Sequence, residues 1–119
     1  VVDWGYRSDD LPVKLFGSWT TLPAGPATLA ARTNAVIVPV VARRIEDGRY
    51  TPIMYDPIEV VDTSPAALAA ATQDIADALE AMVADAPDQW YTFKPMWPAT
   101  DAETAELERR AAQAGGIDV

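Results

Sequence analysis

Three short stretches of this chain hold the residue types that could bind a ligand. The first is Asp3-Trp4-Gly5-Tyr6-Arg7, where an acid and a base flank a glycine at the expected end of a strand. Open α/β sheets place ligand groups at such strand ends, and an arginine there can hold a phosphate through two parallel hydrogen bonds. Asp3 and Arg7 are therefore candidate ligand-binding residues. The alternative is an ordinary Asp-Arg pair in a surface turn.

The second stretch is the Pro-Ala-Gly-Pro turn at residues 23–26, which precedes an expected helix. A helix N-terminus carries free N–H groups and a partial positive charge, and both favour a bound anion. Gly25 permits a tight backbone path, and Pro26 suits the first helical turn because no donor is needed there. Since Pro26 also removes one donor, a phosphate-binding turn and a purely structural turn are equally compatible with this pattern.

The third stretch, residues 89–98, is rich in aromatic side chains and contains two prolines. Amphipathic rings of this kind lie at headgroup depth in a membrane, and they serve equally well as a cover over a hydrophobic core. Both interpretations stay open for the four candidate membrane-contact residues, Trp90, Tyr91, Phe93 and Trp97.

The chain contains neither cysteine nor histidine. This composition excludes a thiolate nucleophile, a cysteine zinc site and a histidine general base within these 119 residues. The three serines, at positions 8, 18 and 64, lack a Gly-x-Ser-x-Gly setting, and the acidic residues are scattered over turns and helix faces. We therefore expect this chain to supply no catalytic residue and to hold no cofactor and no metal ion.

Length and charge restrict the class of protein further. A chain of 119 residues, half of them hydrophobic, suits one globular core. The net charge of -9 and the lack of a basic stripe argue against a nucleic-acid partner. Residues 1–44 carry five basic and three acidic side chains, whereas the remainder is strongly acidic. We expect the first part to lie near an anionic phosphate or lipid headgroup.

The expected secondary structure mixes strands and helices, which predicts the α/β class. Strands are expected at residues 1–4, 11–16, 36–41, 50–55 and 58–61, with a helix at 26–33 that Asn34 ends in the left-handed conformation. A turn at residues 46–48 is expected to form a hairpin in which 50–55 is the return strand. The run 36–41 is continuously apolar, as in a strand covered on both faces. Pro39 within it belongs at an edge, a bulge or a functional rim, because proline cannot donate to a strand ladder.

A long amphipathic helix is expected from Pro65 to about Ala84, with Ser64 as its N-cap. We expect it to pack on the sheet; the alternative, a membrane-surface helix, is disfavoured because its polar face is acidic. Beyond Thr100 the sequence is rich in Ala, Glu and Arg. We expect residues 99–119 to form an acidic, flexible C-terminal tail, as a frayed helix or disorder.

The order of the motifs resembles one known family. The motifs are Asp-x-x-Tyr-Arg from residue 3, Pro-Val-x-x-Phe-Gly from 12, Thr-x-Pro-x-Gly-Pro-x-x-Leu-Ala-x-x-Thr from 21, Val-Pro-Val from 38, Asp-Gly-x-Tyr from 47 and Gln-Trp-Tyr from 89. Together they resemble the C-terminal half of the lysophospholipid acyltransferase-like family, of the lipid A lauroyl or myristoyl acyltransferase and phosphatidylinositol mannoside acyltransferase type. The resemblance covers roughly residues 1–98, as the C-terminal part of an acyltransferase domain. It implies a partial glycerolipid-acyltransferase-like fold, a mixed sheet covered by helices.

The resemblance also implies a function. Members of this family move a fatty acyl chain from acyl-CoA or acyl carrier protein to a glycolipid hydroxyl, at the cytoplasmic face of the inner membrane with peripheral membrane contact. Their catalytic histidine, followed within a few residues by Asp or Glu, lies upstream of every motif present here. No catalytic residue is therefore carried over, and we expect the chain to be a fragment that is inactive alone.

Some substrate-binding positions do carry over from the resemblance. Asp3, Gly5 and Arg7 fall where related acyltransferases have a Glu-Gly-Thr-Arg block that contacts the acceptor phosphate. Because this chain has Asp-Trp-Gly-Tyr-Arg instead, only Arg7 is carried over as a contact with that phosphate. Gly25 and Pro26 match the family's Pro-x-Gly-Pro turn. An alternative of a different class is a complete, non-catalytic α/β module that recruits a lipid or protein partner through the aromatic stretch.

Overall fold

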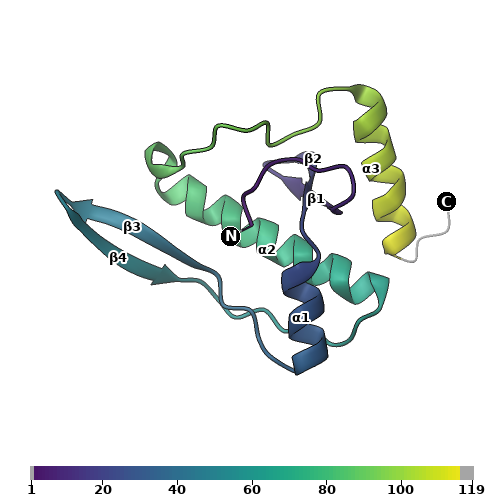
Figure 1. The fold of residues 1–119 in the computed structure, drawn as a ribbon, viewed down its shortest axis with the longest axis horizontal. Coiled ribbons are helices and arrows are strands. Elements are labelled where there is room, and N and C mark those ends of the chain that lie inside the picture. Colours follow the sequence, from purple (N-terminus) through teal and green to yellow (C-terminus); the bar gives the residue numbers. More distant parts are fainter. Residues whose placement is uncertain (1, 116–119) are drawn as a thin grey trace.

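The computed structural model describes residues 2–115, which form a flat molecule of 51 × 37 × 18 Å (Figure 1). The elements follow in the order β1 (Leu11–Leu15), β2 (Ser18–Leu22), α1 (Gly25–Thr33), β3 (Val40–Glu46), β4 (Arg49–Met54), α2 (Pro65–Asp85), the 3-10 helix η1 (Pro87–Gln89) and α3 (Asp101–Ala114). The α/β class is confirmed. Within the described residues the four strands form two separate antiparallel hairpins, β1–β2 and β3–β4.

The first hairpin turns through Phe16 and Gly17, and only its first strand was predicted. Both turn residues have positive φ, 52° and 78°, which matches the twist of the flanking strands. Glycine adopts this conformation freely, whereas Phe16 does not; its backbone N–H donates to Glu80 Oε1 at 2.5 Å. The strand predicted at residues 11–16 includes Phe16 of this turn, and β2, which begins at Ser18, was not predicted.

The helices α1 and α2 are confirmed close to their predicted bounds. Asn34 adopts the left-handed conformation, with φ of 57°, at the C-terminus of α1. The Ser64 hydroxyl accepts a hydrogen bond from the backbone N–H of Ala67 at 3.2 Å and so caps α2. The capping residues therefore made the C-terminus of α1 and the N-terminus of α2 predictable from the sequence.

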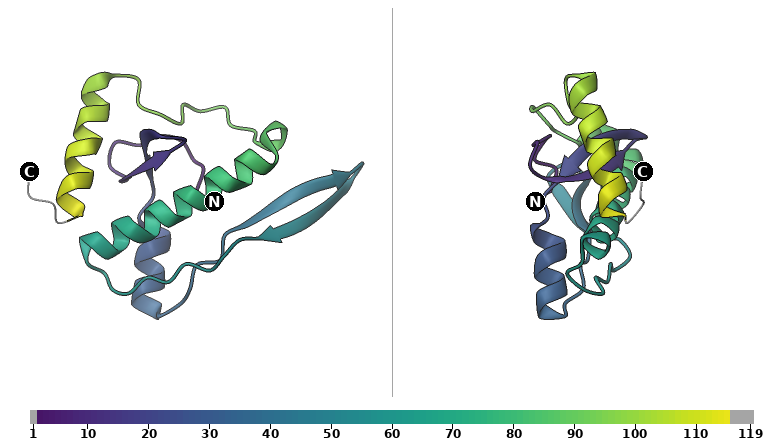
Figure 2. Two further views of the ribbon diagram at one scale, coloured as in Figure 1. Left: turned by 180° about the vertical axis from the view of Figure 1, so that it is seen from behind. Right: turned by 90° about the vertical axis from the view of Figure 1, so that its right-hand side faces the viewer.

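The hydrophobic core lies where α2 crosses the first hairpin (Figure 2). Its buried residues form two groups, the first of Val13, Leu22, Ala27, Ile58, Ala71, Ile75 and Ala76, and the second of Leu15, Leu79, Val83 and Met96. Because α2 contributes to both groups, this helix joins the N-terminal hairpin to the aromatic stretch.

The apolar run at residues 36–41 is not a strand covered on both faces, so this prediction was wrong. Ile37 forms a single antiparallel bridge with Ile58, and β3 begins only at Val40. Val36, Val38 and Val40 are 51%, 43% and 49% exposed. The segment leaves the core and enters the β3–β4 hairpin, which extends beyond the core alongside α2 (Figure 1). Its valines therefore stay partly exposed.

The two other short strands expected from the sequence are also missing. Residues 2–4 form no strand, and Val1 lies outside the described residues. Of residues 58–61, only Ile58 pairs, in the bridge to Ile37. By contrast, the predicted turn at residues 46–48 does connect β3 to β4, and Pro39 lies at the entry to β3, where its carbonyl accepts from the Tyr55 N–H at 2.9 Å.

Residues 101–114, expected as a frayed helix or disorder, form the helix α3 (Figure 2). The Thr100 hydroxyl accepts from the Glu103 N–H at 3.2 Å and caps this helix. Leu107 is only 1% exposed, and α3 packs against both strands of the first hairpin. The sequence signal was weak because Leu107 is the only bulky apolar residue of α3. The division of the chain at residue 98 stays a prediction.

Candidate functional site

A cavity of about 620 Å³ lies between the start of β3, the C-terminal half of α2 and the aromatic stretch. Most of its wall is apolar, and Ile37, Val38, Leu79, Met82 and Val83 are among the residues that line it. Small-molecule sites typically have volumes of about 300–1,000 Å³ and walls of this kind. The cavity therefore suits an apolar group, such as an alkyl chain.

Four of the predicted site residues, Asp3, Pro26, Trp90 and Tyr91, meet at this cavity. Asp3 Oδ2 accepts a hydrogen bond from the indole Nε1–H of Trp90 at 3.1 Å. This bond joins the N-terminal segment to the aromatic stretch, which are far apart in the sequence. Asp3 is thus one of several polar groups in a mostly apolar wall, together with Arg43 and Gln89.

The turn at residues 23–26 lies at the N-terminus of α1, as predicted. No side chain caps this helix, whose N-cap is Ala24, and Pro26 occupies one of its first two positions. Gly25 is not among the residues that line the cavity. Of residues 23–26, Pro26 alone therefore lines the cavity, and proline has no backbone N–H group with which to bind an anion there.

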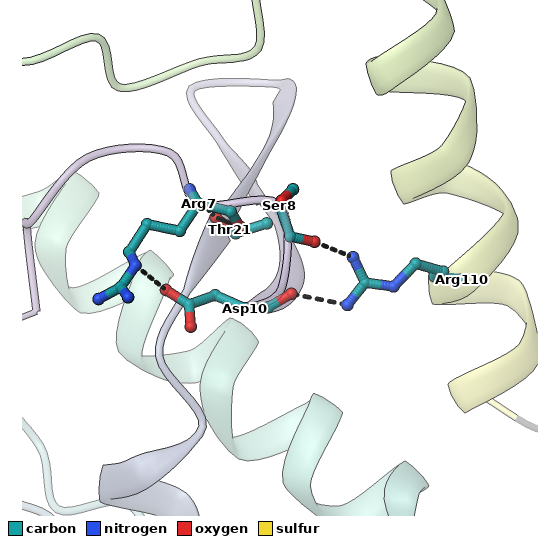
Figure 3. A network of polar contacts seen from close by, with 5 residues as sticks. All are labelled: Arg7, Ser8, Asp10, Thr21 and Arg110. Carbon is teal, nitrogen blue, oxygen red and sulfur yellow. Dashed lines mark hydrogen bonds and ion pairs between the residues drawn. The ribbon is translucent and has the colours of Figure 1, made fainter.

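Arg7 lies outside the cavity lining, in a turn that precedes β1 (Figure 3). Its backbone N–H donates to Thr21 Oγ1 at 2.9 Å, and the same hydroxyl donates to the Arg7 carbonyl oxygen at 2.8 Å. The guanidinium Nε lies 4.0 Å from Asp10 Oδ2, and 64% of the side chain is exposed. The backbone of Arg7 is therefore fixed, while its charged group stays accessible to an anion.

The structure separates Asp3 from Arg7 by holding the segment between them against the aromatic stretch. The Tyr6 N–H donates to the Pro95 carbonyl at 2.9 Å, and Lys94 Nζ lies 4.4 Å from the centre of the Trp4 ring. Gly5 has φ of 109°, and a Cβ there would lie 3.0 Å from the Pro95 carbonyl oxygen. Glycine is required at position 5 for both reasons.

The four aromatic candidates divide into two pairs. Trp90 and Trp97 are half-buried against the core, and Trp97 Nε1 donates to the Leu15 carbonyl oxygen at 3.3 Å. Tyr91 and Phe93 are 68% and 95% exposed. The first pair therefore covers the core, and only the second pair is free to meet a membrane or a partner. In the part of the chain that the structure describes, no helix has both the length and the apolarity to cross a membrane.

Two glutamine side chains, which sequence analysis did not single out, bind strand edges in the manner of a neighbouring strand. Gln89 accepts from the Arg44 N–H at 2.8 Å and donates to the Arg44 carbonyl at 2.9 Å. Gln73 of α2 makes the same pair of bonds with Lys14, at 2.8 and 2.9 Å. Each side-chain amide thus satisfies one backbone N–H and one C=O group at the edge of a two-stranded sheet, where unpaired groups can bind a strand of another molecule. No local pattern reveals such long-range contacts.

We expect Gln73→Ala and Gln89→Ala each to lower the free energy of unfolding by about 1 kcal/mol, because each removes two hydrogen bonds to an exposed strand edge. Gln113→Ala, on the exposed surface of α3, is the matched control. Urea unfolding measures the stability, and amide hydrogen exchange at Lys14 and Arg44 reports the edges directly. Unchanged exchange at these amides would contradict the role of the glutamines.

Comparison with known proteins supports the assignment that the motifs suggested. The family model for bacterial lipid A biosynthesis acyltransferases matches residues 1–98. The phosphatidylinositol mannoside acyltransferase of Mycolicibacterium smegmatis is 36% identical over 99 residues, which cover 83% of this chain and 30% of that protein. The protein of the same name from Mycobacterium tuberculosis H37Rv is 31% identical over 99 residues, with the same coverage.

The chain thus spans about 30% of the length of these curated relatives. The match includes the Arg7 turn, the Pro26 turn and every residue that lines the cavity, and it ends before α3. Since the family model covers well over half of the chain, the chain belongs to the bacterial lipid A biosynthesis acyltransferase family.

Proposed function

We propose that this chain is the distal part of a longer acyltransferase, called the full-length enzyme below. That enzyme transfers a fatty acyl chain from acyl-CoA or acyl carrier protein to the hydroxyl of a membrane glycolipid. The observation that carries the proposal is the family match over residues 1–98, together with relatives named phosphatidylinositol mannoside acyltransferase. Because the 119 residues contain no histidine, a histidine base and its acidic partner would come from a part of the enzyme outside them.

The cavity gives this chain a role in binding rather than in the chemical step. Its apolar wall, formed by residues such as Val38, Leu79 and Val83, would contact an alkyl chain of the donor or of the acceptor. Burial of each methylene group contributes about 0.8 kcal/mol, so a wall of this kind is a substantial source of substrate affinity. Asp3, whose carboxylate accepts a hydrogen bond from Trp90, would lie near the polar end of the bound alkyl chain.

Arg7 provides the complementary contact with an anionic headgroup. Its guanidinium is exposed on a backbone that Thr21 fixes from both sides, which favours recognition of a phosphate. We place the full-length enzyme at the cytoplasmic face of the inner membrane as a peripheral protein, with Tyr91 and Phe93 at headgroup depth. The acceptor would then meet Arg7 from the membrane side.

An acyl-transfer assay tests the proposal. We expect the purified 119-residue chain to transfer no more acyl chain than buffer, because it lacks a histidine base, and we expect the full-length enzyme to be active. Acyl-CoA and acyl carrier protein are supplied in parallel as donors, with a phosphatidylinositol mannoside as acceptor. Activity of the 119-residue chain well above buffer, or an inactive but folded full-length protein, would overturn the proposal.

A further inference from the structure

The helix α3 lies beyond the residues that the family model matches, yet it holds the turn that carries Arg7. Arg110 Nη1 donates to the Ser8 carbonyl oxygen at 2.9 Å, and Arg110 Nη2 donates to the Asp10 carbonyl oxygen at 2.7 Å (Figure 3). The planar guanidinium presents several donors in a fixed geometry, so it can bridge two carbonyls at once. One side chain of α3 therefore bridges both ends of the turn at residues 8–10.

Arg110 is itself well placed for this task. It lies three residues after Leu107, on the same face of α3, and Leu107 is 1% exposed. This helix packs against both strands of the first hairpin. Arg110 is half-buried, whereas its neighbour Arg109 is exposed and pairs with Glu106 at 2.5 Å. The two adjacent arginines therefore point to different partners, one to the turn and one along the helix surface.

Hydrogen bonds to the backbone hold the turn from three directions, while the Arg7 side chain stays exposed. Thr21 fixes the Arg7 backbone, the Asp10 N–H closes the turn by donating to the Arg7 carbonyl at 3.1 Å, and Arg110 holds the carbonyls of Ser8 and Asp10. Loss of Arg110 would free only one of these restraints, the one supplied by α3. The turn would then sample more conformations, and the direction of the Arg7 side chain would vary with it.

We propose that Arg110 is a positioning residue for Arg7, holding the turn at residues 8–10 so that the Arg7 guanidinium meets the anionic headgroup of the acceptor. This inference rests on the proposed function, because it needs Arg7 to bind that headgroup. It assigns a part in substrate recognition to a helix outside the region that defines the family. Arg110 touches no substrate and acts only through the turn.

The test compares four variants of the full-length enzyme: Arg110→Ala, Arg110→Lys, Arg7→Ala and the double variant Arg7→Ala/Arg110→Ala. Arg109→Ala is the matched control, since it removes a neighbouring arginine that pairs along the helix surface. We expect Arg110→Ala to raise KM for the acceptor about tenfold with kcat within about twofold, because a binding contact is weakened in ground state and transition state alike. Arg110→Lys should recover part of the loss, since one donor can still reach one carbonyl.

The double variant separates positioning from general stabilisation. If Arg110 acts through Arg7, adding Arg110→Ala to Arg7→Ala should change KM by less than about twofold, because coupled residues are not additive. A full tenfold effect in the Arg7→Ala background would overturn the proposal, and so would an Arg109→Ala effect as large as that of Arg110→Ala. Melting temperatures show that each variant is folded.

The remaining outcomes distinguish this inference from the proposed function. If Arg7→Ala impairs the enzyme and Arg110→Ala does not, the positioning role is overturned while the headgroup role of Arg7 stands. If Arg7→Ala is near-native, the positioning role of Arg110 and the headgroup role of Arg7 both fail, while the acyltransferase function of the full-length enzyme stands. Amide hydrogen exchange of Asp10, whose N–H closes the turn, should speed up in Arg110→Ala and stay unchanged in Arg109→Ala.

Discussion

Replacing Arg7 with alanine in the full-length enzyme is expected to lower kcat/KM about thirtyfold, which corresponds to about 2 kcal/mol of lost transition-state binding. The expectation follows from an exposed guanidinium on a backbone that Thr21 holds through two hydrogen bonds. Arg7→Lys keeps the charge but loses the two-pronged geometry, so it should recover only part of the activity. Acyl-transfer kinetics with varied acceptor concentration measure both variants.

The alternative is that Arg7 only pairs with Asp10 on the surface. Their closest approach is 4.0 Å, and exposed pairs of this kind contribute about 0–1 kcal/mol. In that case both Arg7 variants should change stability and activity by less than about 1 kcal/mol. Asp10→Asn distinguishes the two roles, because it removes the partner carboxylate and leaves a headgroup contact intact. Near-native kcat/KM in Arg7→Ala would exclude Arg7 from the site.

The parts of the fold that could be predicted are those with local signals. Ser64 and Pro65 begin α2, Asn34 ends α1, and the turn at residues 46–48 joins β3 to β4, because capping and turn chemistry act within a few residues. The strand β2 carried a local signal as well, the Phe16-Gly17 turn, but an aromatic residue at positive φ is an uncommon one.

The parts that could not be predicted depend on contacts between distant segments. A continuous apolar run such as 36–41 indicates a buried strand, yet here the run leaves the core and most of its valines are exposed. Burial of such a run depends on which other segments pack against it, and the run's own residues do not show this. The site shows the same limit. Asp3 and Arg7 were predicted together, and the structure turns Asp3 towards Trp90 and Arg7 towards Asp10. Arg110 gave no signal, because its carbonyl partners lie about a hundred residues away.

The helix α3 departs most from the sequence-based expectation, and Leu107→Ala measures how much its packing contributes to stability. We expect this substitution to lower the free energy of unfolding by about 3 kcal/mol, since large-to-small changes at buried leucines cost about 2–5 kcal/mol. Leu107 is 1% exposed and packs α3 onto the first hairpin, so its loss should also loosen the turn that Arg110 holds.

Glu108→Ala is the matched control, since it changes the next residue of the same helix on its exposed face. We expect it to alter stability by less than about 0.5 kcal/mol, as for most surface substitutions. Urea unfolding of the 119-residue chain measures both variants, and amide exchange of Asp10 should speed up only in Leu107→Ala. If Leu107→Ala cost no more than Glu108→Ala, α3 would be the flexible tail that the composition suggested. Arg110 would then lie on a mobile segment and could not hold the turn at residues 8–10 in one conformation.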